Sequence, residues 1–163
     1  MIAHGSSILI DSEGGSRLVE NLRVGDAVLN PLGGYTDYIT AIAKQTVRVD
    51  GASSFRKGLV PRRLRKHCIS KVAPAADIVL SGDQVISVAL KQPGDRYPII
   101  TQLRVDALQE HKIEVETVGQ FEVDYYAISL QTGHQIVANN LLCNVERLSI
   151  DAPEQIGVRV AQS

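Results

Sequence analysis

The stretch GHQIVANNLLCN, residues 133–144, decides the class of fold that this sequence predicts. Apolar residues alternate through it, which is the period of a half-buried β-strand, and Asn139-Asn140 interrupts the alternation. Asn favours turns because its side chain bonds to nearby backbone and tolerates the left-handed conformation. The stretch is therefore either a hairpin with polar turns or a place where the side chain of Asn144 attacks its own backbone.

The same strand signals run along most of the chain. Short apolar runs are separated by Gly, Pro, Asn and Asp, a spacing that predicts an all-β sandwich or barrel. Aromatic residues are scarce, with five Tyr, two Phe and no Trp, so the core must be built from Val, Ile, Leu and Ala. One segment, 103–111, predicts one or two helical turns. The expected strands are 7–12, 27–30, 35–49 (one long strand or a bent pair), 78–90 (two short strands around a turn at 81–83), 97–103, 111–118, 121–130 and 134–142.

Length and composition limit the classes of function. The chain has 163 residues, enough for one domain with a substantial core. Its 17 basic side chains balance 18 acidic ones, which argues against a nucleic-acid binder. Two cysteines, Cys68 and Cys143, are too few for a disulfide scaffold, and no paired metal-ligand motif is present, so we expect no metal and no cofactor. Without a signal-peptide pattern or a membrane-length apolar run, a monomer in the cytoplasm with no membrane contact is the default expectation.

A basic segment, FRKGLVPRRLRKHC at residues 55–68, differs in kind from the rest of the chain. Its clustered Arg and Lys side chains could neutralise phosphates or dock an acidic partner. However, the acidic residues elsewhere cancel this charge, and only Phe55 could stack on a base. We therefore interpret the segment as a solvated loop or a short helix.

Several segments stand out because of their order and spacing. The chain opens with MIAHGSSI, residues 1–8, continues through Gly14-Gly15 and reaches VENLRVGDAV at 19–28. Ser81-Gly82-Asp83-Gln84 lies inside the apolar run IVLSGDQVISV, and the closing segments are YAI at 126–128, HQIVANN at 134–140 and CN at 143–144. Together these segments resemble the conserved blocks of the Hedgehog/intein family of self-processing domains, called Hint. The Val-Glu-x-Leu-x-x-Gly-Asp part of the first block is intact.

The resemblance covers residues 1 to about 145, nearly the whole chain. It implies a flat, horseshoe-like and pseudo-symmetric all-β module that brings its two ends together. We accordingly expect a Hint domain over residues 1–145 and a tail or final strand over 146–163. The chain is too short to hold the endonuclease that many inteins carry.

The resemblance also implies a reaction, in which the thiol of a first-residue Cys attacks the preceding carbonyl while a His in the second block protonates the leaving amine. Met1 stands at the nucleophile position, and a thioether cannot attack. Gln84 stands at the His position, and an amide cannot move a proton near neutral pH. Ser6 matches a structural Thr of the family and is expected in a core or turn role. We therefore expect the N-terminal acyl shift to be lost.

The C-terminal half of the family's reaction is better preserved. There an Asn side chain attacks its own carbonyl and forms a succinimide, and Asn144 has that position. His134 either assists, by polarising the carbonyl or protonating the leaving amine, or is a buried hydrogen-bonding His. Cys143 replaces a penultimate His and is either a small buried hydrophobe or a low-pKa thiol beside His134. Ala127 replaces an assisting Asp, and Val145 offers no nucleophile for full splicing.

These residues leave three hypotheses open. The first is a Hint domain that has lost its activity and serves as a structural or protein-interaction module. The second is a domain that still cleaves itself after Asn144, acting on its own flanking polypeptide with no external substrate. The third, from another class, is a β-rich binding domain whose basic segment 56–67 docks an acidic partner.

Overall fold

The computed structural model describes residues 1–31, 33–48, 57–118, 122–146 and 159–160. Strands dominate it, and the described helical segments are three short 3-10 turns, so the predicted all-β class is confirmed. The 3-10 turns are η1 (Val19–Asn21), η2 (Lys57–Leu59) and η3 (Val105–His111). The strands are β1 (Ile2–Ala3), β2 (Ser7–Leu9), β3 (Ser16–Leu18), β4 (Ala27–Asn30), β5 (Tyr35–Arg48), β6 (Pro61–Leu64), β7 (Ile78–Ser81), β8 (Val85–Leu90), β9 (Ile99–Arg104), β10 (Glu116–Thr117), β11 (Glu122–Leu130), β12 (Gln135–Ala138), β13 (Leu141–Asn144) and β14 (Arg159–Val160).

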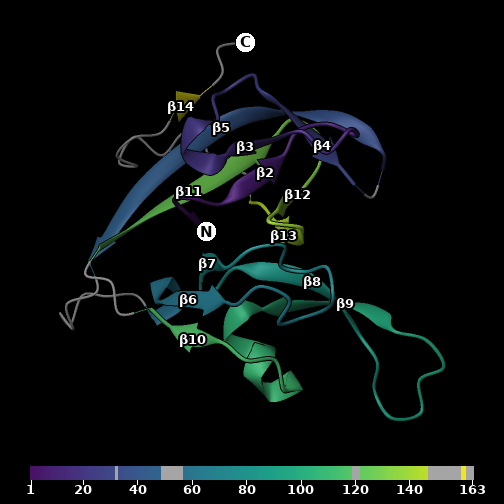
Figure 1. Cartoon of the computed structure of the whole chain (residues 1–163). Coiled ribbons are helices and arrows are strands. Elements are labelled where there is room, and N and C mark those ends of the chain that lie inside the picture. Colours follow the sequence, from purple (N-terminus) through teal and green to yellow (C-terminus); the bar gives the residue numbers. More distant parts are fainter. Residues whose placement is uncertain (32, 49–56, 119–121, 147–158, 161–163) are drawn as a thin grey trace.

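The strands form two sheets (Figure 1). The first follows the order β10-β6-β7-β1-β11-β5-β14, with β4 also paired to β5, and the second follows β3-β2-β12-β13-β8-β9. Every pairing between the described strands is antiparallel, and the longest joins β5 to β11, from Arg48 opposite Glu122 to Ile39 opposite Leu130. In Figure 1 the N-terminus lies in the middle of the molecule, between the long β5–β11 pair and the lobe of β6, β7 and β8. The first residue is thus placed centrally rather than at an edge.

The core is aliphatic, as the composition predicted. Its fully buried side chains come from both sheets, so burial ties the two sheets together. Each such side chain contributes about 1.5–3 kcal/mol relative to an exposed one. The largest buried aliphatic residues are Ile2, Ile8, Ile39, Leu64, Ile78, Leu80, Ile86, Leu108, Ile128 and Ile136.

The stretch 133–144 is a hairpin. β12 pairs with β13 from Gln135 opposite Asn144 to Ala138 opposite Leu141. Asn139 and Asn140 form the two-residue turn with φ angles of 46° and 63°, the left-handed conformation that such hairpin turns require. The Asn139 side chain accepts the Ser7 N–H at 2.7 Å, which ties the turn to β2. Local turn chemistry therefore places Asn144 at the end of β13.

The block at 19–28 also has a local explanation. Val19–Asn21 forms η1, and Gly25 adopts a φ of 92°, which strongly favours glycine. The Asp26 carboxylate accepts the Arg23 N–H at 2.8 Å and closes the turn before β4. The positive φ at residue 25 favours Gly, and the hydrogen bond from the Arg23 N–H favours Asp at residue 26.

Two secondary-structure predictions need correction. The basic segment is helical only at η2 among its described residues; Pro61–Leu64 is a strand, and its arginines pair with acids of the same chain. Arg62 lies 3.1 Å from Asp106, and Arg65 lies 2.9 Å from Glu116. The strand predicted over 111–118 is reduced to β10, because η3 extends through His111. The helical turns predicted at 103–111 are confirmed by η3.

β14 pairs with β5, Arg159 opposite Ile42 and Val160 opposite Ala41, so the chain after Asn144 includes a strand. No helix in the described part of the chain has the length and apolar character needed to span a membrane.

Candidate functional site

The turn between β7 and β8 brings the first residue and the end of the 135–144 hairpin together. β1 lies between β7 and β11, with Ile2 opposite both Leu80 and Tyr126, and β13 pairs with β8 through Cys143 and Ile86. A pocket of about 130 Å³ opens where these strands meet. It is lined by Met1, Ile2, Asp83, Gln84, Val85, Tyr126, Ala127, Ile128, Asn144, Val145 and Glu146. Met1, Gln84 and Asn144, chosen from sequence, therefore share one pocket.

On the N-terminal side of this pocket, Ser81 holds Met1. The Met1 nitrogen donates to Ser81 Oγ at 2.5 Å, and the Met1 carbonyl accepts the Ser81 N–H at 2.9 Å. Ser81 is fully buried, and its hydroxyl donates to Asp83 Oδ1 at 2.6 Å. Burial lowers the pKa of the Met1 α-amino group, and Asp83 acts in the opposite direction. The turn between β7 and β8 therefore binds the backbone of residue 1 through hydrogen bonds from and to Ser81, whereas the Met1 side chain supplies no nucleophile.

On the C-terminal side, Gln84 holds the Asn144 carbonyl. Gln84 is only 6% exposed, and its Nε2 donates to the Asn144 carbonyl oxygen at 2.7 Å and to the Val85 carbonyl at 2.9 Å. The Asn144 Oδ1 accepts from Gln135 Nε2 at 3.0 Å, and Asn144 Nδ2 donates to no other described residue. The carbonyl that an Asn side chain would attack is thus already polarised by a buried amide.

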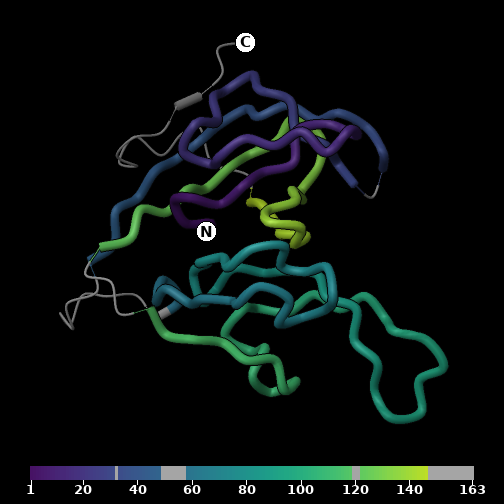
Figure 2. The backbone as a smooth tube through the Cα atoms, viewed as in Figure 1, coloured from purple at the N-terminus to yellow at the C-terminus, as the bar shows by residue number. Residues whose placement is uncertain are grey.

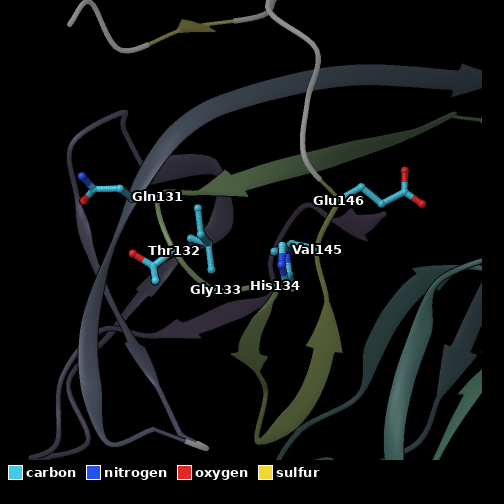
Figure 3. A pocket seen from close by; sticks show the side chains of 7 residues that line it. Gln131, Thr132, Gly133, His134, Val145 and Glu146 are labelled. Carbon is cyan, nitrogen blue, oxygen red and sulfur yellow. The ribbon is translucent and has the colours of Figure 1, made fainter.

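His134 lies beside the bond that follows Asn144. The Val145 N–H donates to the His134 carbonyl at 2.7 Å, and both residues line a second pocket of about 150 Å³ (Figure 3). The His134 side chain is exposed, so its interpretation as a buried hydrogen-bonding His is wrong. The two pockets share Val145 and Glu146. The His134 backbone therefore contacts the nitrogen of the bond between Asn144 and Val145, whereas the Gln84 side chain contacts its carbonyl oxygen.

The backbone before His134 is clamped by Asp37, a residue that the sequence did not single out. Asp37 is 1% exposed, and its carboxylate accepts the N–H groups of Tyr38 at 2.9 Å, Thr132 at 3.1 Å and Gly133 at 2.6 Å. A Cβ on Gly133 would come within 2.7 Å of the Asp37 carboxylate, so glycine allows this close approach. The sequence around Asp37 does not reveal this role, because Thr132 and Gly133 lie 95 and 96 residues further along the chain.

Cys143 belongs to the core and not to the pocket. It is fully buried, and burial raises the pKa of its thiol to about 12. The burial of Cys143 agrees with the small buried hydrophobe and argues against a low-pKa thiol beside His134. Ala127 does line the pocket with Met1 and Asn144, but it carries no carboxylate. Among the described residues, no group of three or more His, Cys, Asp or Glu side chains could hold a metal ion.

Residues 3–147 match a family model described as the Hint domain. Among solved structures, the chain is similar to the crystal structure of a DnaB intein from Synechocystis sp. PCC 6803, at 12% sequence identity and a TM-score of 0.49, covering 90% of this chain and 98% of that one. No curated protein matches the chain. Because the family model spans most of its length, this protein belongs to the Hint domain family of self-processing domains.

Proposed function

We propose that this Hint domain keeps the C-terminal half of self-processing and has lost the N-terminal half. The side chain of Asn144 cyclises, and the peptide bond between Asn144 and Val145 breaks. The 2.7 Å hydrogen bond from Gln84 Nε2 to the Asn144 carbonyl carries this proposal, because it puts a buried donor on the oxygen that becomes negative during the attack.

The proposed step is an intramolecular attack at Asn144. Asn144 Nδ2 attacks the carbonyl carbon of the same residue and closes a five-membered ring. Negative charge develops on the carbonyl oxygen, where the Gln84 amide stabilises it. The carbon–nitrogen bond to Val145 then breaks, the proton lost by Nδ2 is transferred to the Val145 nitrogen, and the products are a succinimide and a free amine.

Two contacts support the leaving side of this step. The Val145 nitrogen is held by the His134 carbonyl at 2.7 Å, and Ser129 Oγ donates to the Glu146 carbonyl at 2.9 Å. Both fix the segment that departs, so the reacting groups are positioned before the chemistry begins. The His134 imidazole, next to Val145, is the group assigned to deliver the proton.

The N-terminal half lacks both of its reacting groups. Met1 has no thiol or hydroxyl, and Gln84 cannot exchange a proton near neutral pH. On this proposal residues 1–144 form the self-processing fragment, residues 145–163 lie beyond the bond that breaks, and the substrate is the chain's own flanking polypeptide in cis. Val145 supplies no nucleophile, so cleavage is not followed by splicing.

A second candidate is an inactive Hint module that serves a structural or protein-interaction role. It is favoured by the same pocket, because among the described residues the side chain that contacts the Asn144 carbonyl is Gln84, and an amide does not exchange protons near neutral pH. The two candidates differ in one measurable property, which is cleavage after Asn144. The basic-segment docking hypothesis receives less support, since Arg62 and Arg65 already pair with Asp106 and Glu116.

Intact mass during a long incubation tests the proposal. We expect a fragment that ends at Asn144 and weighs one water less than the hydrolysed fragment, together with a peptide that begins at Val145. Asn144→Ala should abolish both products, whereas Asn140→Gly should not, because Asn140 sits in the hairpin turn at a φ of 63° that glycine adopts readily. A full-length mass that never changes would establish the inactive module instead.

A further inference from the structure

The second sheet ends in an open edge. β9 pairs with β8 on one side, from Leu90 opposite Ile99 to Val85 opposite Arg104, and no described strand pairs with its other side. A strand at the edge of a sheet presents unpaired N–H and C=O groups that can accept another strand. The β8–β9 register is continuous over six residue pairs without a bulge, so this edge is regular.

The open edge is also apolar. Tyr97 is 70% exposed, Ile99 58% and Ile100 67%. Successive side chains of a strand point to opposite faces, so Ile99 and Ile100 expose apolar surface on both faces of the hairpin. Figure 2 shows the loop between β8 and β9 as an arm that stands away from the body of the molecule. The apolar surface therefore lies on a projecting element, where a partner can reach it.

The usual protections of an edge are missing here. Natural edge strands carry charges, prolines or bulges that prevent pairing with another chain. Residues 99–103, IITQL, contain no charge and no proline. The charge at the end of the strand, Arg104, lies 3.7 Å from Asp106 of the same chain.

We propose that two copies of this chain associate through the outer edges of β9, antiparallel about a twofold axis at Thr101. Residues directly opposite each other in an antiparallel pair point to the same face of the sheet. The twofold axis must therefore lie between two copies of the same residue. With the axis at Thr101, Ile99 of each copy lies opposite Leu103 of the other. Arg104 then falls opposite Pro98 and not opposite the second Arg104, which avoids a like-charge pair. This register thus pairs Ile99 with Leu103 on one face and keeps the two Arg104 side chains apart.

The area involved sets the strength of the association. An aromatic side chain carries about 150–250 Å² of surface, and with that range applied to Tyr97, Ile99 and Ile100 their exposures give roughly 600–1,000 Å² for the pair. Stable complexes bury about 1,200–2,000 Å². The contact is therefore weak, and the chain is a single copy when dilute and a pair when concentrated.

Sedimentation at increasing concentration tests the association. From about 10 μM to about 1 mM, we expect the average mass to rise from that of one chain toward twice that value. Ile100→Lys should hold the mass at that of one chain. Val72→Lys is the matched control, because Val72 is also an exposed apolar residue, at 65%, and lies outside the hairpin. A constant single-chain mass in the unmodified protein, or loss of the pair in Val72→Lys alone, would overturn the proposal.

Cross-linking tests the register independently. In a Cys68→Ser background, Thr101→Cys places two thiols directly opposite each other at the axis, whereas Gln102→Cys places each thiol opposite Ile100. We expect a disulfide-linked pair to form at least tenfold faster for Thr101→Cys under mild oxidation. Equal rates for the two variants would show that the copies do not pair in this register.

Discussion

Replacing Gln84 by Leu tests both the architecture and the chemistry of the pocket. Leu has a similar volume and is compatible with the buried site, but it cannot donate a hydrogen bond. The change removes the donors to the Asn144 carbonyl at 2.7 Å and to the Val85 carbonyl at 2.9 Å. Two carbonyls in a pocket where Gln84 is only 6% exposed thus lose their partner.

The expected loss of stability follows from these two bonds. A neutral hydrogen bond contributes about 0.5–1.5 kcal/mol net, and an acceptor left without a partner in a buried site costs about 1–3 kcal/mol. Part of this is offset by the apolar Leu side chain, so we expect the free energy of unfolding to fall by about 1–3 kcal/mol. A domain of this kind has a total of about 5–15 kcal/mol, so the change is large enough to measure.

The expected loss of activity is larger. Removing one donor to a developing oxyanion slows a reaction by about 10²–10³. Gln84→Leu should therefore lower the rate of succinimide formation at Asn144 by that factor while the folded state persists. A loss of activity without unfolding would separate the role of Gln84 on the carbonyl from its role in the fold.

Urea unfolding and intact mass, measured on the same samples, provide the two readouts. Gln109→Leu is the matched control, because Gln109 Nε2 also donates to a backbone carbonyl, that of Val115 at 3.1 Å, but Gln109 is exposed. We expect the control to change stability by less than about 0.5 kcal/mol and to leave cleavage unchanged. If Gln84→Leu matches this control in both readouts, the buried amide neither stabilises the junction nor assists the reaction.

Three further predictions concern other parts of the site. Asp37→Asn removes a charge that accepts three backbone N–H groups and should cost about 2 kcal/mol in urea unfolding; an effect no larger than that of the exposed Glu122→Gln would contradict the clamp. Because burial raises the pKa of Cys143 to about 12, the folded state favours the neutral thiol, and stability should fall as pH rises above about 9, by up to about 1.4 kcal/mol per pH unit. Cys143→Ala should make the free energy of unfolding fall less steeply with pH between about pH 9 and pH 11. An unchanged slope would rule out the contribution of the Cys143 thiol. In a chain extended upstream of residue 1, Met1→Cys together with Gln84→His should produce thiol-dependent N-terminal cleavage by mass, whereas either change alone should not.

The strands and the hairpin could be predicted from the sequence because their causes are local. Alternating apolar residues report which face of a strand is buried, and Asn139-Asn140 tolerates the left-handed turn that joins β12 to β13. The blocks at 1–8, 19–28 and 134–144 indicated the Hint family by their order and spacing. The same local signals failed at Pro61–Leu64, where clustered charge suggested a solvated segment. There Arg62 pairs with Asp106 of η3 and Arg63 with Glu116 of β10, and the segment itself does not reveal these distant partners.

The contacts that make the site depended on tertiary structure. Gln84 and Asn144 are 60 positions apart, and Asp37 and Gly133 are 96 apart, so no local pattern predicts either hydrogen bond. Sheet register decides them, because a strand that pairs one residue out of place turns every side chain to the opposite face. The sequence by itself determined which residues occupy the family's reactive positions. Only the folded sheets decided that Gln84, not His134, contacts the Asn144 carbonyl and that Cys143 is buried in the core, because those outcomes depend on how distant strands align.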